Sequence, residues 1–159
     1  MTAHVQTSVW LAALMVAGVG AGTASAQAGE GVYVPASQIS ALVTKTTDGV
    51  ATAQVPTGPG TILLAARRTA DGLVEVHTKL NDEFVVQSGR AKVLVGGKVE
   101  GNRETAPGEW RGGKVTGARA YALGPGDVLW IPAGAPHQTL VPKGGSFSYL
   151  AFKFDAAAR

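Results

Sequence analysis

The sequence of 159 residues contains no cysteine. Disulfide bonds, cysteine-ligated zinc sites and lipid attachment through a cysteine are therefore excluded, and a folded domain has to be stabilised by its hydrophobic core. Histidine is scarce as well, with three residues in the whole chain. Imidazole is the commonest protein ligand of catalytic transition metals, so a metal site in this chain has very few residues to draw on.

Charge of one sign is also lacking. Fourteen basic and eleven acidic side chains leave a net charge of +3. These residues are scattered, and Arg67-Arg68 is the only adjacent basic pair. Nucleic-acid binding needs a concentrated basic face, which this sequence does not contain. The sequence also has no nucleophile elbow, phosphate-binding loop or dinucleotide fingerprint, so the commonest hydrolase, kinase and dehydrogenase classes are not indicated.

The apolar run from Val9 to Ala17 is too short to span a bilayer comfortably. Small residues follow it and end in Ala24-Ser25-Ala26. This layout is typical of a secretory signal peptide. It predicts a signal peptide over residues 1–26 with cleavage after Ala26, a secreted or periplasmic protein, and no membrane attachment after cleavage.

The remaining chain is long enough for one domain with a real core. Residues 27–60 are expected to form an N-terminal segment with a short helix near 35–43, and residues 61–155 a β domain. Short apolar or alternating runs divided by Gly-rich turns are typical of an all-β sandwich or barrel. Such runs lie at 61–66, 73–79, 84–86, 91–95, 118–123, 128–131, 138–141 and 147–154. Residues 96–117 show no sustained period and are predicted to form a long surface loop.

The two histidines after the predicted signal peptide are the candidate metal ligands. Strand alternation puts Glu75, His77 and Lys79 on one face of the predicted strand. A turn at 81–82 would bring Glu83 beside His77 or Lys79 as a cross-strand neighbour. His137 follows a Pro- and Gly-rich turn, and closure of a barrel would have to bring it to His77. Two imidazoles and a carboxylate are the minimal set that leaves positions open for substrate.

Two segments resemble the two motifs of the cupin superfamily, as found in small secreted bacterial cupins. The first is His77-x-Lys79, three residues, Glu83 and then Gly89. The second is Gly126-Asp127, Pro132-Ala133-Gly134 and His137. The resemblance implies an all-β jelly-roll barrel, a ligand pocket in its lumen and a bound divalent metal. The first motif departs from the family where Lys79 replaces a second histidine, because an ammonium group has no lone pair for a metal.

Three interpretations of the site remain open. In the first, His77, Glu83 and His137 hold Fe, Mn, Ni or Zn, and the protein acts on a small oxygenated substrate as a dioxygenase or an isomerase/lyase. In the second, metal binding is weak or absent, Lys79 pairs with Glu83, and the protein is a non-catalytic binder of a small ligand. In the third, burial lowers the pKa of Lys79, which then serves as a general base or a Schiff-base amine.

Further residues are candidates for substrate binding. Alternation turns either Arg67 or Arg68 inward, and the inward arginine, for which Arg67 is the candidate, could bind a carboxylate or phosphate through its planar donor groups. Tyr121 and Trp130 are expected on barrel strands, where they could line the pocket. The partner predicted for the site is a small-molecule substrate or ligand. A homodimer is also predicted, because dimerisation covers the exposed edge strands of small sheets.

Overall fold

The computed structural model describes residues 31–157. The predicted signal peptide at residues 1–26 lies outside the described residues. Within them, no helix combines the length and the apolar character that crossing a membrane requires. The predicted short helix is present as α1 (Ala36–Leu42), which begins directly after Pro35. Proline suits this position because its fixed φ matches a helix start and the missing N–H has no partner to lose there.

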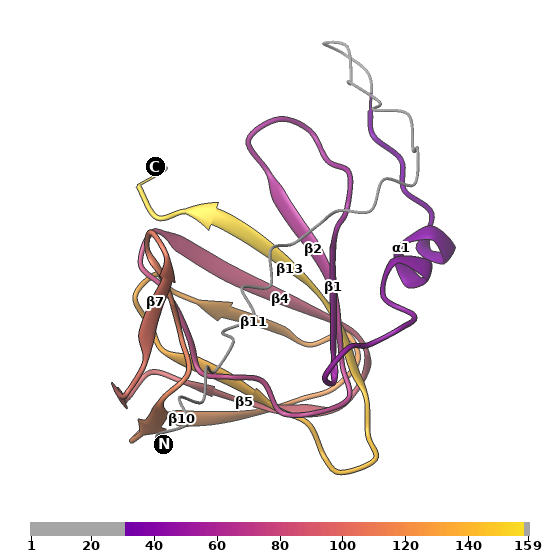
Figure 1. The fold of residues 1–159 in the computed structure, drawn as a ribbon. Coiled ribbons are helices and arrows are strands. Elements are labelled where there is room, and N and C mark those ends of the chain that lie inside the picture. The colour runs from indigo at the N-terminus through magenta and orange to yellow at the C-terminus, as the bar shows by residue number, and fades with distance from the viewer. Residues whose placement is uncertain (1–30, 158–159) are drawn as a thin grey trace, which may run out of the picture.

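The strands form two main sheets and one small hairpin (Figure 1). The five-stranded sheet has the order β1 (Val50–Gln54), β2 (Ile62–Arg68), β13 (Phe147–Asp155), β4 (Leu80–Gly89) and β11 (Val128–Ile131). The six-stranded sheet has the order β10 (Arg119–Leu123), β5 (Ala91–Val95), β12 (His137–Leu140), β3 (Glu75–His77), β8 (Glu109–Arg111) and β7 (Arg103–Ala106). The hairpin consists of β6 (Lys98–Glu100) and β9 (Lys114–Thr116).

The two main sheets pack face to face as a jelly roll, which confirms the predicted all-β fold. All paired strands are antiparallel, and the sheets are not joined by a strand pairing within residues 31–157. Strand β1 was not predicted, and it pairs along its whole length with β2. The helix lies outside the five-stranded sheet, beside β1 and β2 (Figure 1).

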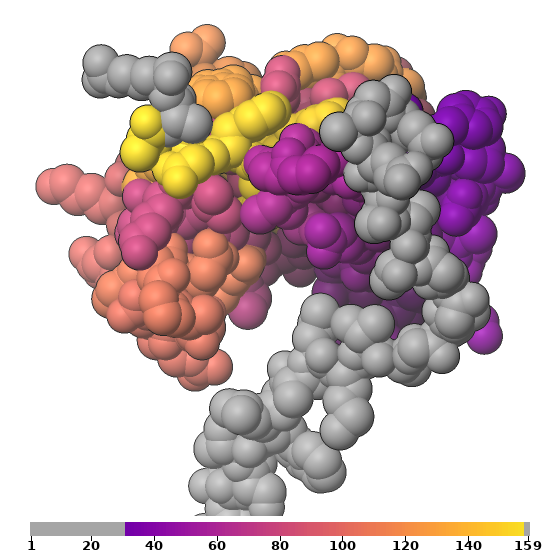
Figure 2. Space-filling view, turned by 90° about the horizontal axis from the view of Figure 1, so that it is seen from above, coloured from indigo at the N-terminus to yellow at the C-terminus, as the bar shows by residue number. Residues whose placement is uncertain are grey.

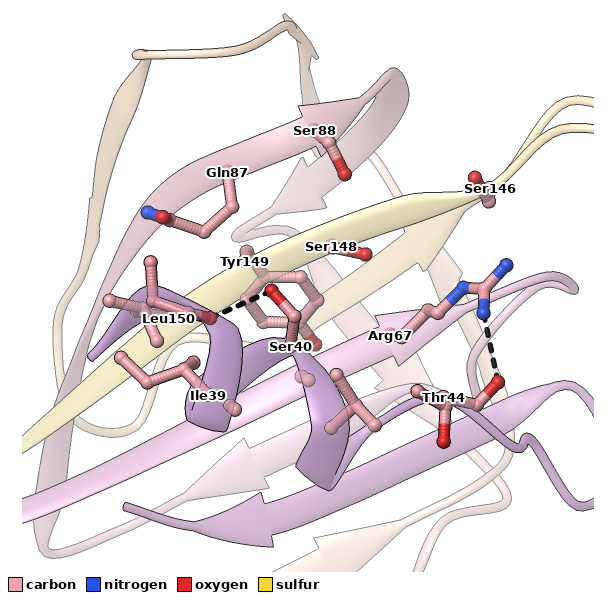
Figure 3. Close-up of a pocket in the computed structure, with 14 residues that line it drawn as sticks. Ile39, Ser40, Thr44, Arg67, Gln87, Ser88, Ser146, Ser148, Tyr149 and Leu150 are labelled. Carbon is pink, nitrogen blue, oxygen red and sulfur yellow. Dashed lines mark hydrogen bonds between the residues drawn. The ribbon is translucent and has the colours of Figure 1, made fainter. Parts of the chain in front are cut away.

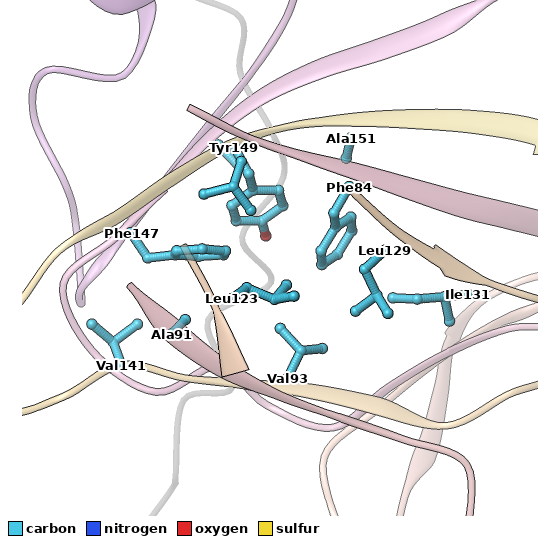
Figure 4. Close-up of a cluster of buried hydrophobic side chains, with 12 residues drawn as sticks. Phe84, Ala91, Val93, Leu123, Leu129, Ile131, Val141, Phe147, Tyr149 and Ala151 are labelled. Atoms are coloured by element: carbon cyan, nitrogen blue, oxygen red, sulfur yellow. The ribbon is translucent and has the colours of Figure 1, made fainter. Parts of the chain in front are cut away.

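Strand alternation divides the apolar side chains between two layers. One layer fills the space between the sheets and includes Phe84, Phe147 and Tyr149 (Figure 4). The other lies between the outer face of the five-stranded sheet and α1, with Val43 and Leu63 among its buried members. Burial of both layers is the main source of stability in a chain that has no disulfides.

Residues 96–117 do not form the predicted loop. They contain the four short strands β6 to β9. Strand β8 pairs with β3, and β7 pairs with β8, so this excursion extends the six-stranded sheet. Most of these strands have three residues, which is too short for alternation to be recognised in a Gly-rich sequence. In the space-filling view, the salmon-coloured excursion and the indigo segment with α1 lie on opposite sides of the molecule (Figure 2).

Candidate metal centre

Two strands of the six-stranded sheet bring the two histidines together. His77 lies at the end of β3 and His137 at the start of β12, where Glu75 is its cross-strand partner. The two ring centroids are 5.3 Å apart, and both side chains are almost completely buried. One ligand atom each from Glu75, His77 and His137 lie within 4.8 Å of one another. The distance is short enough for these three residues to share one metal ion.

The turn before β12 positions His137. Gly134 has a φ of 79°, a left-handed conformation that glycine adopts without strain. Its N–H donates to the carbonyl of His77 at 2.8 Å, and the N–H of Ala133 donates to Oδ1 of Asn81 at 2.9 Å. The turn is therefore hydrogen-bonded directly to His77 at the end of β3 and to Asn81 in β4, and this fixes the two histidines relative to each other.

The carboxylate that faces the histidines from β4 is Asp82. The turn after β3 falls at residues 78–79, earlier than predicted, and β4 begins at Leu80. Such a shift reverses which residues face inward. Asp82 Oδ2 lies 3.3 Å from His77 Nε2 and 3.8 Å from His137 Nε2. Glu83, the predicted ligand, is not among the residues grouped at this centre, and it alternates away from the inward-facing Asp82 and Phe84.

The first motif is therefore better aligned on the residues that converge. Its sequence is Glu75-x-His77, four residues, Asp82, six residues and Gly89. Glu75 lies where the cupin pattern has its first histidine, and Asp82 lies where that pattern has its glutamate. Gly89 ends β4 with a φ of 76°, and a Cβ atom there would lie 1.8 Å from the carbonyl oxygen of Ser146. Only glycine fits this position, which both alignments of the motif share.

An ammonium group does enter the site, but it belongs to Lys153 and not to Lys79. Lys79 is exposed in the turn between β3 and β4. Lys153 faces inward from β13, and its Nζ donates to Asp82 Oδ1 at 2.6 Å. The same Nζ lies 3.2 Å from His77 Nε2. The pairing predicted between Lys79 and Glu83 is thus found between Lys153 and Asp82.

Each histidine has its Nδ1 atom engaged and its Nε2 atom directed at the centre. His77 Nδ1 lies 2.6 Å from Glu109 Oε2, and His137 Nδ1 lies 3.2 Å from the carbonyl oxygen of Ala135. An Nδ1–H that donates to an oxygen leaves Nε2 as the metal-binding atom, an arrangement typical of metal-ligating histidines. His137 Nε2 is buried and has no hydrogen-bond partner in the structure. A buried polar atom without a partner needs an explanation, and a metal ion bound at this point would provide one.

The positive charges and hydrogen bonds around the centre lower the pKa values of its two buried acids, Glu75 and Asp82. Burial opposes ionisation of Glu75, but the hydrogen bond with His77 and the positive charge of Arg111 outweigh it and hold the Glu75 pKa well below its ordinary value. Burial likewise opposes ionisation of Asp82, whose pKa is lowered by the hydrogen bond with His77 and by Lys153. Both carboxylates are therefore charged at neutral pH.

The two histidines differ in protonation. Burial disfavours the charged form of His77, yet its hydrogen bonds with Asp82 and Glu75 raise its pKa to about 9. Burial lowers the pKa of His137, which is therefore neutral at pH 7. While His77 is protonated, its Nε2 and Lys153 Nζ are both donors, so Asp82 is the acceptor that holds the two together. A ligand histidine has to lose this proton, so binding of a metal would release it.

The adjacent arginines of β2 face opposite sides of the sheet. Arg68, and not the predicted Arg67, faces the interior, where it donates to Glu75 Oε1 at 3.0 Å and to the Tyr149 hydroxyl at 3.2 Å. Arg111 from β8 also pairs with Glu75 and donates to Glu109 Oε2 at 3.2 Å. Arg67 donates to the carbonyl of Thr44 on the outer side of the sheet.

The two predicted aromatic residues are not at the centre. Tyr121 packs against the apolar core, and the guanidinium of Arg119 lies 5.0 Å from its ring centroid. Trp130 is half exposed on β11 and stacks on Phe154, with 5.9 Å between the ring centroids. The residues that sequence reasoning missed are Glu75 as a candidate ligand, Asp82, Lys153, and the pair Glu109 and Arg111 from the excursion.

Three cavities bear on access to the site. A small inner cavity of about 120 Å³ is lined by Glu75, Asp82 and Lys153 on one side and by apolar residues on the other. A cavity of about 460 Å³ at the mouth shares Arg68, Glu75 and Arg111 with it. The largest, about 510 Å³, lies under α1 on the outer face, where Arg67 and Ser148 line it (Figure 3). It is lined by no carboxylate, whereas the smaller inner cavity is lined by Glu75 and Asp82 of the cluster.

Neither a protein-family model nor a curated protein matches the sequence. Solved structures do match. An uncharacterised conserved protein with a double-stranded β-helix domain from Klebsiella pneumoniae aligns with a TM-score of 0.54 and 15% identity, over 76% of this chain and 90% of that one. A cupin-2 domain protein from Rhodospirillum rubrum aligns with a TM-score of 0.51 and 17% identity, over 74% and 69% of the two chains.

A third match is the FeII form of HppE, with a TM-score of 0.50, 18% identity and coverage of 70% of this chain and 55% of that one. The chain spans half the length of another matched enzyme, the DMSP lyase DddQ from Ruegeria pomeroyi. At these identities the likeness establishes the double-stranded β-helix fold and leaves the activity to be argued from the site.

Proposed function

Because this chain has the fold of the cupin superfamily, we propose that it binds one divalent metal through Glu75, His77 and His137 and acts on a small oxygenated substrate. The observation that carries the proposal is the buried, unpartnered Nε2 of His137, which faces the ligand atoms of His77 and Glu75. Asp82 can complete the set as a fourth donor. Imidazole and carboxylate ligands suit Fe, Mn, Ni or Zn, and one matched structure is of an FeII protein.

The residues around the centre support this role. Glu109 and the carbonyl of Ala135 hold both imidazoles with Nε2 directed at the centre, so neither ring has to reorient on binding once His77 has lost its Nε2 proton. Phe84 and Tyr149 close the apolar side of the inner cavity, which limits access of bulk water. A bound divalent ion would polarise a carbonyl, enol or hydroxyl oxygen of the substrate. The reaction types we propose are those of a dioxygenase or an isomerase/lyase.

Metal titration of the purified protein tests the proposal. We expect about one equivalent of metal to bind the wild type, by calorimetry and elemental analysis, and His137→Ala to weaken binding about 100-fold or more, since a direct ligand is lost. Glu83→Gln is the matched control, because this carboxylate lies on the same strand as Asp82 but outside the group. No binding of Fe, Mn, Ni or Zn to the wild type would contradict the proposal.

A metal-independent ligand-binding protein is the second candidate function. The specific observation in its favour is that Glu75 and Asp82 already have cationic partners in Arg68, Arg111 and Lys153. The negative charges of these two carboxylates are thus compensated without a metal. Saturable binding of a small ligand by protein treated with a chelator would favour this alternative.

We also propose that the protein is exported and forms a homodimer. The apolar run at residues 9–17 and the Ala24-Ser25-Ala26 site support export through a cleaved signal peptide. The edge strand β11 exposes Val128 and Trp130, and Phe154 stacks beside Trp130, so an apolar patch lies at a sheet edge. Light scattering after size-exclusion chromatography tests the dimer, and Trp130→Ser should shift it toward the monomer.

A further inference from the structure

Every acidic group that faces the centre is held by an internal cation. Glu75 receives Arg68 at 3.0 Å and also pairs with Arg111. Asp82 receives Lys153 at 2.6 Å, and Glu109 receives Arg111 at 3.2 Å. Each of the three carboxylates thus has a cationic side chain beside it. Burial of unpaired charges is costly, so these pairings allow the cluster to form in the absence of any other ion.

A divalent ion bound by Glu75 and Asp82 would change these pairings. Those carboxylates would be shared with the metal, and the same three side chains would be left with less negative charge beside them. Arg68, Arg111 and Lys153 would then be cations without full partners in a site of low dielectric constant. Such groups attract an anion strongly, and a planar guanidinium binds a carboxylate in a bidentate manner.

The volume and lining of the inner cavity and of the cavity at its mouth indicate which anion would fit. Arg68 and Arg111 line both the inner cavity and the mouth, and therefore stand where a ligand passes from one to the other. The inner cavity of about 120 Å³ has room for only a few non-hydrogen atoms, and its far wall is made by Leu64, Phe84 and Ala151. A charged head at the arginines and a short apolar body beyond them fit this distribution.

We propose that the centre takes a small monocarboxylate with a short apolar body, and that metal and anion bind with positive coupling. Arg68, Arg111 and Lys153 hold the acidic ligands in the free protein, and they become the anion-binding groups when the metal takes over Glu75 and Asp82. The inference rests on the proposed function, because it needs the metal site. It adds the substrate class and the coupling between metal and anion.

Calorimetry with Zn²⁺ and propionate as probes tests the coupling. We expect Zn²⁺ loading to strengthen propionate binding about tenfold, and propionate to strengthen Zn²⁺ binding by the same factor, because coupling between two sites is reciprocal. Propanamide, which has the same shape and no charge, should not gain affinity. Equal affinity of propionate for the zinc-free and zinc-loaded protein would overturn the inference.

A variant separates binding by the arginines from simple coordination of propionate to zinc. Arg111→Met removes one guanidinium from a side chain that is a third exposed, so the fold should persist. It should lose most of the tenfold gain that Zn²⁺ loading gives the wild type, whereas Arg103→Met, on the exposed strand β7, should behave as the wild type. An unchanged gain in Arg111→Met would overturn the inference and leave the metal site standing. Failure of the wild type to bind any divalent metal would instead contradict the proposed function itself.

Discussion

Polar side chains have different partners on the inner and outer faces of the five-stranded sheet. On the inner face, Arg68, Asp82 and Lys153 are buried or nearly so, and each has an oppositely charged partner within hydrogen-bond distance. On the outer face, Arg67 donates to a backbone carbonyl and lies beside serine hydroxyls in the cavity under α1. The outer cavity is the larger of the two by about 390 Å³.

This difference shows that the candidate centre is identified by the charged partners of its buried side chains and not by the volume of its cavity. Charged groups are buried only when other charged groups meet them, so a buried cluster requires several strands to agree in register. In this protein β2, β3, β4, β8, β12 and β13 all contribute to it. The outer cavity, by contrast, requires only that α1 packs across the sheet. Four predictions test this comparison of the two faces, and the largest expected effect comes first.

The largest contrast should come from two phenylalanines on opposite faces of β13. Phe147 is fully buried between the sheets, and Phe154 is more than a third exposed on the other face. Phe147→Ala should lower the free energy of unfolding by about 3–5 kcal/mol through lost burial and a cavity. Phe154→Ala should cost about 1 kcal/mol or less. Urea unfolding measures both, and similar losses would mean that the inner layer is not the dominant core.

The adjacent arginines give a matched pair for the polar groups. Arg68→Met should lower the free energy of unfolding by about 1–3 kcal/mol, because Glu75 and the Tyr149 hydroxyl lose a buried donor. Arg67→Met should change it by no more than about 0.5 kcal/mol, since one hydrogen bond to a backbone carbonyl is lost at the surface. Equal effects in thermal or urea unfolding would contradict the assignment of Arg68 to the buried cluster.

The same alternation explains which parts of the site could be predicted from the sequence. The strands were visible because apolar residues repeat every second position, and the scarcity of histidine left only His77 and His137 for a paired site. The identity of the carboxylates depended on where the β3–β4 turn falls. A turn at 78–79 in place of 81–82 exchanges Glu83 for Asp82, and no local signal distinguishes the two.

Other members of the centre were not predictable because they come from distant segments. Glu109 and Arg111 lie in a three-residue strand of the Gly-rich excursion, and only its pairing with β3 brings them to His77 and Glu75. Lys153 faces inward because β13 continues past the apolar core in the same register. A signal did exist for Glu75, since its two-residue spacing from His77 places both on one face of a strand.

The third prediction concerns the residue that orients His77. Glu109→Gln should weaken metal binding about tenfold, because a neutral amide holds the Nδ1–H less strongly and makes the ring a poorer ligand. Glu100→Gln, on the same excursion but exposed on β6, is the control. Metal titration by calorimetry measures both. Unchanged affinity in Glu109→Gln would show that the excursion does not support the centre.

The smallest effect should come from Lys79, the position that departs from the cupin pattern in the first alignment of the motif. Lys79→His would restore a second histidine if that alignment described the site, and metal binding would tighten. Lys79 is exposed in the turn after β3, whereas Glu75 fills the corresponding inward position. We therefore expect the metal affinity of Lys79→His to stay within about twofold of the wild type, since changes at exposed positions away from such features have small effects. The variant to compare with it is Glu75→His, which places the histidine of the cupin pattern at the position that faces His137. If calorimetry instead finds tighter metal binding in Lys79→His, the β3–β4 turn adopts the longer register in the metal-bound protein, and the alignment on Glu75 and Asp82 is wrong.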